Sequence, residues 1–409
     1  MQKALPKGWK MVRLGDIASN EKFSIRMGPF GSQLKKHELV NEGIKVLWIE
    51  NIVNNEFRWL DNKCITSKKF EDLEGFQVRP NDILTTTMGT IGRTCVVPSD
   101  IGQAIISSHL LKISPNLTMV DPTFVAKYIS SEVAQHYLDR NSHGIVMKGL
   151  NTSIIKKLPV PLPPLPTQHK IVEILEEASN LRNLRQQANG KMKDLIPSLF
   201  VEMFGDPAIN PKGWEVKKLG ESAYITKLAG FEFTKYVQYI DNGEIIAIRG
   251  INLKDGTLDL TDIKRIKKEV SDTLPRSKVF KDDILMTFVG SIGSVAIAPE
   301  SNIFHLGPNV SKIRVQNTRL NVRFLHSFLK SFASKQVKKL SKTTSMGSIS
   351  MQNIRQLFVP LPPLSLQQEF TKLVEDIETE KARQAESKKN LDELFNSLMQ
   401  RAFTGQLAA

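Results

Sequence analysis

Two kinds of hydrophobic pattern alternate along the chain, and each occurs twice. Residues 1–160 and 206–359 carry short β-branched runs, such as Val46–Ile49 and Ile245–Ile248, that glycine, asparagine, aspartate and proline interrupt. Residues 167–204 and 366–403 are rich in leucine, glutamate, lysine, glutamine and alanine, which favour helix, and contain one proline, Pro197. The pattern predicts two strand-rich α/β domains, each followed by a long helix.

Both helical segments repeat apolar residues every seven positions. With Ile171 and Phe370 at heptad position a, positions a and d of each helix form the seam that would face its partner. This seam is apolar at its ends and polar in the middle, at Arg185 in one helix and at Glu380 and Gln384 in the other. Antiparallel pairing brings the polar layers together, and such layers fix register. The predicted coiled-coil residues are Ile171, Ile174, Leu181, Met192, Leu195, Leu199, Phe370, Leu373, Ile377, Leu391, Leu394 and Leu398.

The expected fold class is therefore α+β, with two mixed domains separated by two long antiparallel helices and related by a pseudo-two-fold axis. Each helix of roughly 36 residues would be about 54 Å long, more than one turn of B-DNA at about 34–36 Å. The alternative is that each helix packs on its own domain as core.

Four motifs return at an offset of roughly 200 residues, which indicates a tandem duplication. They are PKGW at 6–9 and 211–214, a D-I-L element at 82–84 and 283–285, G-x-I-G at 89–92 and 290–293, and a proline run at 158–165 and 357–364. The proline runs should form stiff extended spacers, and Thr167 and Ser365 should cap the helices that follow. A proline-rich ligand for another domain is the alternative. The expected segments are 1–160, 161–205, 206–359 and 360–409.

Composition favours a nucleic-acid partner. The formal net charge is +14 and the pI is about 9.5, and cations gain affinity for phosphates by releasing counterions. A merely soluble basic protein is the alternative. Cys64 and Cys95 fit neither a metal site nor a disulfide framework, so we expect buried thiols. Because no run of about 18 apolar residues and no secretion signal occurs, we expect a cytoplasmic location without membrane contact.

The order and duplication of these motifs, together with GPFGS at 28–32 and FGDP at 204–207, resemble the specificity subunits of type I restriction-modification enzymes over the whole chain. The resemblance implies that each globular part is a target-recognition domain for one half of a bipartite DNA site. It also implies that the helices set the spacer and dock two methylation subunits, which form an adenine methyltransferase. Motor-nuclease restriction subunits would cleave unmodified DNA.

Loops that combine glycine with small polar and basic residues are the candidate DNA contacts, through phosphates and base edges. The candidates are Arg26, Gly28, Ser32, Gln33, Lys35, Lys36, Thr87, Ser108, His109, Lys148, Asn151, Lys227, Lys235, Arg249, Asn252, Thr287, Asn309, Lys342, Ser345 and Ser348. Trp9 and Trp214 are interpreted as core anchors, and the repeated glycines fit tight turns as well as close approach to DNA. The loop MGPFGSQLKK has no close counterpart in LAGFEFTKYV, which predicts two different half-sites.

Catalytic signatures are missing from the sequence. We find no G-x-x-x-x-G-K-[ST] loop, no Asn-Pro-Pro-Tyr-like methyltransferase motif and no convincing pair of carboxylates for a metal. His109 aligns with Asn309, so the two copies share no catalytic imidazole. We therefore expect a non-catalytic DNA-binding subunit without a cofactor. The alternatives are a coiled-coil scaffold with non-specific nucleic-acid binding and an unrecognised nuclease.

Overall fold

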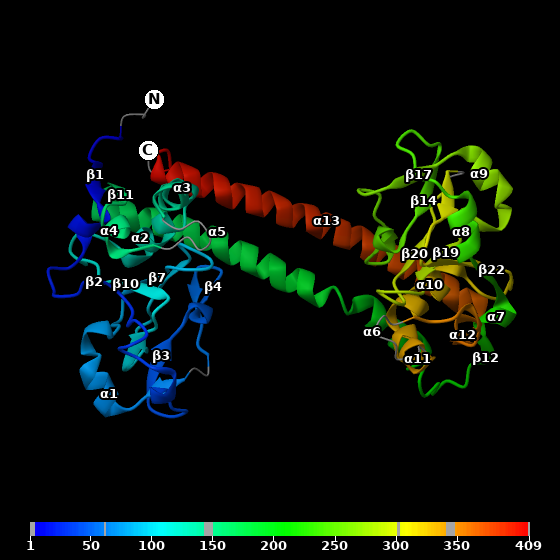
Figure 1. Ribbon diagram of the computed structural model, residues 1–409, viewed down its shortest axis with the longest axis horizontal. Coiled ribbons are helices and arrows are strands. Elements are labelled where there is room, and N and C mark those ends of the chain that lie inside the picture. The colour runs from blue at the N-terminus through cyan, green and yellow to red at the C-terminus, as the bar shows by residue number, and fades with distance from the viewer. Residues whose placement is uncertain (1–4, 61–62, 143–149, 301–302, 341–347, 408–409) are drawn as a thin grey trace. The chain divides into compact units, whose positions relative to one another are not determined.

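The computed structural model describes residues 5–60, 63–142, 150–300, 303–340 and 348–407. The chain divides into two compact units (Figure 1): unit 1 comprises residues 1–186 and 386–409, and unit 2 comprises residues 187–385. Each unit holds one α/β domain and parts of the long helices. The elements of unit 2 repeat those of unit 1 in the same order, as the duplicated motifs predict.

The first α/β domain is built on an antiparallel four-stranded sheet and a mixed three-stranded sheet. The four-stranded sheet has the order β2 (Ile25–Met27), β10 (Leu110–Ile113), β7 (Ile83–Thr86) and β8 (Thr94–Val96). The other sheet has the order β6 (Cys64–Ile65), β3 (Ile44–Leu47) and β9 (Ala104–Ile106). Two small ribbons are β1 (Lys10–Arg13) with β11 (Pro159–Leu162), and β4 (Ile52–Val53) with β5 (Glu56–Phe57).

The second α/β domain has the same strand order, with one further strand, β18, in its mixed sheet. Its antiparallel sheet has the order β13 (Ala223–Lys227), β22 (Val310–Val315), β19 (Ile284–Thr287) and β20 (Val295–Ile297). Its mixed sheet has the order β17 (Lys264–Ile266), β14 (Ile245–Ile248), β21 (Phe304–Leu306) and β18 (Lys278–Val279). The ribbons are β12 (Val216–Lys218) with β23 (Phe358–Pro360), and β15 (Leu253–Lys254) with β16 (Thr257–Leu258). The predicted duplication therefore extends to strand order and pairing.

Short helices cover the sheets. In unit 1 they are α1 (Ser67–Asp72), α2 (Pro122–Ile129), α3 (Glu132–Asn141) and α4 (Thr152–Lys156), with 3-10 turns η1 (Leu14–Ile17), η2 (Lys36–Glu38), η3 (Ile49–Asn51) and η4 (Glu74–Phe76). In unit 2 they are α7 (Leu219–Ser222), α8 (Gly230–Tyr236), α9 (Lys268–Thr273), α10 (Val322–Ser331), α11 (Ala333–Leu340) and α12 (Met351–Arg355), with η5 (Gly250–Asn252) and η6 (Pro275–Ser277). Helices α2 and α10 begin at equivalent caps, where Asp121 and Asn321 accept backbone hydrogen bonds.

The proline runs are extended, as predicted, and each forms one strand of a two-stranded ribbon. Pro161 faces Met11 across β1 and β11, where the missing N–H costs little because both strands are edges. The helices begin earlier than predicted, at Leu165 and Leu364. Thr167 and Ser365 therefore lie inside the first turn and do not cap it. The Thr167 N–H instead donates to the Pro164 carbonyl at 2.9 Å.

The helical segment predicted over residues 167–204 is interrupted. It consists of α5 (Leu165–Lys191) and α6 (Leu195–Phe204), joined by a three-residue turn, whereas α13 (Leu364–Phe403) is a single helix. Pro197 explains the break: it has no N–H to bond to the carbonyl of Lys193, and its ring would clash with that carbonyl in a continuous helix.

A fully buried glutamine fastens each long helix to its domain. Gln168 Nε2 donates to the carbonyls of Met119 (3.0 Å) and Pro163 (2.9 Å), and its Oε1 accepts from the Asp121 N–H at 2.9 Å. Gln367 makes the same set of bonds in unit 2, with the Arg319 and Pro362 carbonyls and the Asn321 N–H. Each glutamine thus joins the start of a helix to the loop before α2 or α10.

The long helices pair antiparallel within each unit. In unit 1, Arg182 Nε of α5 lies 2.7 Å from Asp392 Oδ1 of α13, and Ile171, near the start of α5, shares a core with Phe403, at the end of α13. In unit 2, the Phe204 ring at the end of α6 lies 5.3 Å from the Phe370 ring near the start of α13. Sequence numbers therefore rise along one helix as they fall along the other in both units.

The seam follows a register that differs from the predicted one at alternate positions. Ile171 and Phe370 are buried, and Ile174, Met192, Leu199, Ile377, Leu391 and Leu398 are half-buried, whereas Leu181, Leu195, Leu373 and Leu394 are exposed. The inward positions in their place lie one residue later, at Leu175, Arg182, Ile196, Val374 and Phe395. In several turns both the predicted position and the residue after it are apolar. The heptad pattern alone therefore could not decide which of the two faces inward, that is, whether apolar residues are spaced by three then four residues or by four then three.

Candidate nucleic-acid interface

The candidate loops of the first domain meet at one end of its four-stranded sheet. The Gly28 N–H, just after β2, donates to the Leu110 carbonyl at 2.9 Å. The Thr87 N–H, just after β7, donates to the His109 carbonyl at 3.0 Å, and the Leu150 N–H donates to the Thr87 carbonyl at 3.0 Å. We call these joined segments, residues 28–36, 87–92, 107–109 and 150–151, the first loop edge.

The second domain assembles an equivalent loop edge. The Phe288 N–H donates to the Asn309 carbonyl at 3.0 Å, and the Ile349 N–H donates to the Phe288 carbonyl at 2.9 Å. The Gly307 N–H donates to the Ile248 carbonyl at 2.8 Å, and Lys227 Nζ lies 4.7 Å from the centre of the Phe288 ring. The second loop edge comprises residues 228–236, 249–252, 288–293, 307–309 and 348–350. Segments far apart in the sequence therefore form one surface in each domain.

Several candidate residues are buried and position the loops. Thr87, Thr287 and Asn252 have almost no exposed surface, and the Asn252 amide donates to the carbonyls of Asp259 (2.9 Å) and Asp262 (2.8 Å). A Cβ added at Gly28 would lie only 1.8 Å from the Ser107 carbonyl oxygen. The side chains of Thr87, Thr287 and Asn252 are thus turned away from solvent, and their predicted contact with DNA stays a prediction.

The two candidate arginines make contacts within their own domains. The Arg26 guanidinium lies between the rings of Phe23 and Phe76, 4.0 and 3.7 Å from their centres, and burial lowers its pKa. Arg249 Nη2 lies 2.7 Å from Asp262 Oδ1. Asn151 is exposed, but its side chain caps α4 by accepting from the Ile154 N–H. These residues shape the loop edges.

Other candidates remain open to solvent. Ser32, Gln33, Lys35, Lys36 and His109 are exposed in unit 1, Lys235 and Asn309 are exposed in unit 2, and Ser108, Lys227 and Ser348 are half-buried. Within the described chain, no ion pair is recorded for Lys35 or Lys36. Lys148, Lys342 and Ser345 fall outside the described residues. The exposed cations of the loop edges are therefore available to bind phosphate.

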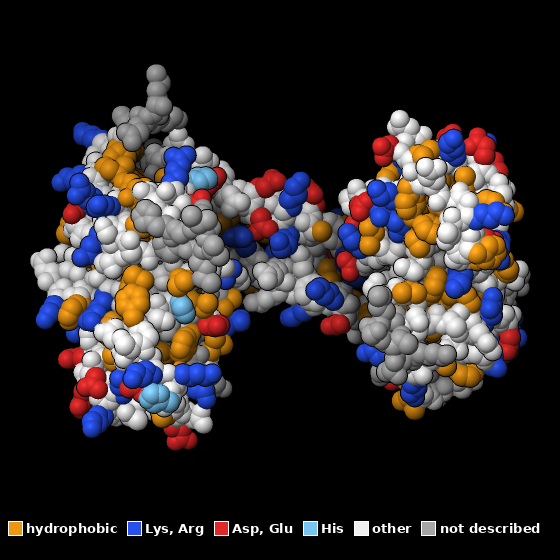
Figure 2. Space-filling view, in the orientation of Figure 1, with side chains coloured by type: hydrophobic (Ala, Val, Ile, Leu, Met, Phe, Trp, Pro, Cys, Tyr) orange, Lys and Arg blue, Asp and Glu red, His pale blue; other side chains and the backbone are white. Residues whose placement is uncertain are grey.

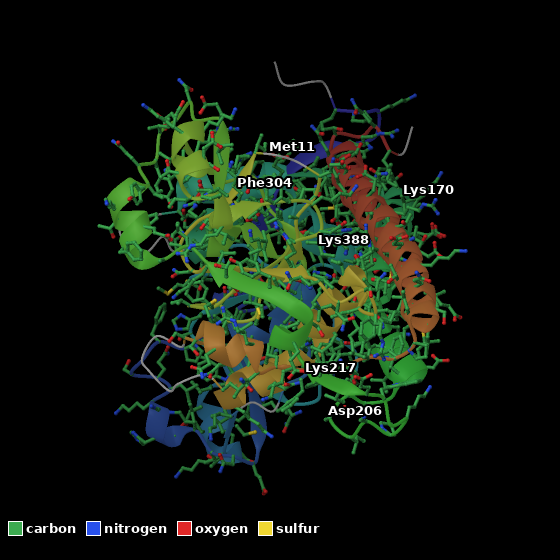
Figure 3. All side chains as sticks on the ribbon, turned by 90° about the vertical axis from the view of Figure 1, so that its right-hand side faces the viewer. Met11, Lys170, Asp206, Lys217, Phe304 and Lys388 are labelled. Carbon is green, nitrogen blue, oxygen red and sulfur yellow. The ribbon has the colours of Figure 1, made fainter. Side chains whose placement is uncertain are left out.

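Net charge alone does not locate a DNA surface on this protein. Lysine and arginine side chains are spread over the visible face of each unit, with acidic residues between them (Figure 2). Exposed Lys170 lies on α5 and Lys388 lies on α13 (Figure 3), so part of the positive charge belongs to the helices. The loop edges are distinguished by their geometry and not by charge density.

The glycine and tryptophan residues of the repeated motifs have structural roles. Gly89, Gly92, Gly290 and Gly293 all have positive φ angles, as tight turns between strands require. Trp9 is half-buried against the core of unit 1, and the Trp214 indole N–H donates to the Phe204 carbonyl at 2.9 Å. The interpretation of the tryptophans as anchors is supported. Cys64 and Cys95 are buried, as expected.

Sequence reasoning overlooked the exposed aromatic residues of the loop edges. Phe30 and Phe231 lie in candidate loops, yet an apolar side chain in a loop is ordinarily assigned to the core. The two loops do not align by sequence identity, so the recurrence of the phenylalanine could have been found only by counting from the ends of the preceding strands.

Neither a metal site nor a membrane span is found in the described part of the chain. No cluster of three or more histidine, cysteine, aspartate or glutamate residues there has the arrangement of a metal site. Likewise, none of the helices searched is long and apolar enough to cross a membrane.

Comparison with known proteins gives a consistent result. The family model for the type I restriction modification DNA specificity domain matches residues 6–191 and again residues 211–391. The type I restriction enzyme EcoBI specificity subunit of Escherichia coli is 24% identical over 82% of this chain and 76% of its own length. The putative type I restriction enzyme MjaX specificity subunit of Methanocaldococcus jannaschii is 22% identical, over 98% of this chain and 94% of its own length.

Solved structures share the fold. A chain from work on the complex assembly and conformational transition of the type I R-M system matches with a TM-score of 0.66 and 20% identity, over 99% of this chain and 100% of its own length. The S subunit of a type I restriction-modification system from M. genitalium matches with a TM-score of 0.54 and 15% identity, over 98% and 97%. The predicted pair of mixed α/β domains with long helices is confirmed.

Proposed function

We propose that this chain, which belongs to the type I restriction modification DNA specificity family, recognises one half of a two-part DNA target with each α/β domain. The observation that carries the proposal is the pair of equivalent loop edges. They stand on the same strand order but carry different residues, such as Gln33 and Lys36 in one and Thr234 and Lys235 in the other. A shared scaffold with divergent loops suits two unlike half-sites.

Exposed side chains of the loop edges divide into two chemical roles. Lys35, Lys36 and Lys235 can bind phosphates and hold each domain in position on the duplex. Asn309 carries an exposed amide, which can recognise an adenine edge in the major groove through paired hydrogen bonds. The exposed Gln33 amide accepts the Phe30 N–H through its Oε1, and its Nε2 can donate to a base edge. The buried threonines Thr87 and Thr287 and the half-buried arginines Arg26 and Arg249 support the loops that present these groups.

The long helices would set the unspecified gap and bind the partner subunits. Leu181, Leu184 and Leu394 are exposed on α5 and α13, and exposed leucines on a long helix suit a protein partner. We propose two methylation subunits as these partners, and motor-nuclease restriction subunits as further members of the complex. Methylation and ATP-dependent cleavage would belong to the partners, this chain would be non-catalytic, and the complex would act in the cytoplasm.

Selection from random-sequence DNA tests the function. The chain, together with its methylation subunits, should enrich a motif of two specified parts separated by a gap of fixed length. Featureless enrichment would instead indicate a scaffold with non-specific binding, and metal-dependent cleavage by the chain alone would indicate a nuclease.

Exchange of one domain tests whether each half-site has its own reader. Replacing residues 1–160 by the corresponding domain of another family member should change one half of the selected motif and leave the other half intact. A change in both halves would contradict independent recognition by the two domains.

A further inference from the structure

An exposed phenylalanine closely follows the equivalent strand in both loop edges. Phe30 follows the end of β2 by three residues and is 59% exposed, and Phe231 follows the end of β13 by four residues and is 71% exposed. The two strands are equivalent, because Ile25 pairs with Ile113 in the first sheet and Ile225 pairs with Ile313 in the second. Single exposed apolar residues are common, but this one recurs where the loops have otherwise diverged.

Both aromatic tips are held by local hydrogen bonds. The Phe30 N–H donates to Gln33 Oε1 at 3.0 Å, and the Gln33 N–H donates to the Phe30 carbonyl at 2.7 Å, which closes the loop into a tight turn. Phe231 lies in the first turn of α8, where Glu232 Oε2 accepts from the Ala229 N–H at 3.0 Å and from Arg276 Nη2 at 2.6 Å. The rings are therefore presented to solvent on a fixed backbone.

The charge around the tips is suited to a duplex. The acidic residues nearest in sequence to Phe30 and Phe231 form ion pairs with basic side chains of other elements. Lys69 Nζ lies 2.7 Å from Glu38 Oε1, and Arg276 pairs with Glu232. Exposed Lys35 and Lys36 follow Phe30 by five and six residues, and exposed Lys235 follows Phe231 by four. Each loop therefore carries exposed cations close along the chain to an exposed ring, as expected of a surface that contacts both phosphates and bases.

We propose that Phe30 and Phe231 are equivalent base-contact residues, each of which presses its ring against an apolar part of a base in its own half-site. This inference rests on the proposed function. A phenyl ring offers phosphate no hydrogen bond, but it can pack on a thymine C5-methyl group in the major groove or wedge between stacked bases. The ring would distinguish base sequences, while the lysines would bind any sequence.

Single substitutions measured on the motif that the wild-type chain selects test the proposal. Phe30→Ala and Phe231→Ala should each weaken binding by about 10-fold to 100-fold, the usual range for loss of an aromatic contact to a base. Each should relax selection in one half-site only. Phe358→Ala is the matched control, because Phe358 is 53% exposed but lies on β23, outside the loop edges. All three variants remove exposed side chains, and unchanged thermal unfolding verifies their folding.

Salt dependence separates base contact from phosphate contact. Phe30→Ala should leave the slope of log affinity against log salt unchanged, whereas Lys35→Ala should reduce that slope by about 1. Two DNA probes then identify the contacted group. Uracil in place of thymine removes the C5-methyl group, and a 2-aminopurine base reports unstacking. Sensitivity to either probe that disappears in Phe30→Ala supports the proposal.

Failure of the inference and failure of the function are distinguishable. If the wild-type chain selects a gapped motif but both phenylalanine variants bind it as the wild type does, only the inference is overturned. An equal loss on the motif and on scrambled DNA also overturns it. If the wild-type chain selects no motif, the proposed function fails and the inference fails with it.

Discussion

At the scale of single residues, the buried glutamines show how one polar side chain can fix a helix to a domain. Gln168 satisfies a backbone N–H and two carbonyls that have little access to water. A buried polar group that loses its partner costs about 1–3 kcal/mol. The position therefore tolerates no apolar substitute, although glutamine in a helix ordinarily indicates an exposed face.

Gln168→Ala should destabilise unit 1 by about 2–3 kcal/mol, because three backbone groups lose their partner at once. Urea denaturation followed by tryptophan fluorescence measures the loss. Gln186→Ala, on the exposed face of the same helix, is the control and should change stability by less than about 0.5 kcal/mol. Equal losses in the two variants would contradict the role of Gln168.

His326 makes the stability of unit 2 depend on pH. Burial, aided by nearby Lys330, lowers the pKa of the His326 imidazole from 6.5 to about 4. Between these values the unfolded chain binds the proton and the folded chain does not, so stability falls as the pH is lowered. The expected loss from this residue between pH 7 and pH 4 is on the order of 2–3 kcal/mol.

His326→Gln should reduce this dependence of stability on pH, and urea denaturation at several pH values measures it. The buried His305, whose pKa burial also lowers, should account for part of the remaining slope. A His326→Gln variant with the full wild-type slope would refute the assignment.

Residue type indicated the chemistry of the candidate sites but not their burial. Asn252 and Gln33 are both amides in loops, yet one is buried in a turn and the other is exposed. The difference depends on the strands that pack around each loop, and those strands come from distant parts of the chain. Exposure therefore could not be predicted from local sequence.

At the scale of elements, composition identified the strand-rich segments and the helices, but not their ends. Helix starts at Leu165 and Leu364 depend on proline carbonyls that accept the first N–H groups, a role that a search for polar caps overlooks. Pro197 was visible in the sequence and marks the interruption between α5 and α6. The duplication, by contrast, was fully visible because motif order survives divergence.

The register of the helix pairing can be tested on α5 by comparing one residue that the structure buries with one that the heptad pattern predicted to be buried. Leu175→Ala should cost about 2–5 kcal/mol, because Leu175 is fully buried and its truncation leaves a cavity. Leu181→Ala should cost less than about 0.5 kcal/mol in the isolated chain, because Leu181 is 53% exposed. Thermal or urea unfolding compares the two, and the reverse order would restore the register predicted from the sequence.

At the scale of the whole molecule, unit 1 is built from two distant parts of the chain. The end of α13 completes the core of the first domain, where the Phe403 ring lies 5.4 Å from that of Phe124 and 5.1 Å from that of Tyr128. Unit 2, in contrast, is formed by the continuous segment 187–385. Stability of the first domain therefore depends on residues that follow the second.

Phe403→Ala should destabilise unit 1 by about 3–5 kcal/mol through the loss of a buried ring. Hydrogen exchange should speed up at the amides of β7 and β10 and stay unchanged at those of β19 and β22. Leu394→Ala, an exposed position on the same helix, is the control. Equal acceleration in both sheets would show that the two cores unfold as one.

The discontinuous make-up of unit 1 has a consequence for biosynthesis. Residues 1–186 emerge from the ribosome first. At that moment Met399, Ala402 and Phe403, which cover the apolar surface around Phe124, Tyr128 and Ile171, have not yet been synthesised. The nascent domain stays incompletely covered while roughly 200 further residues are translated, which takes about 10–40 s at about 5–20 residues per second. During that interval its exposed apolar surface makes it prone to aggregation, and a chaperone that binds apolar surface would protect it.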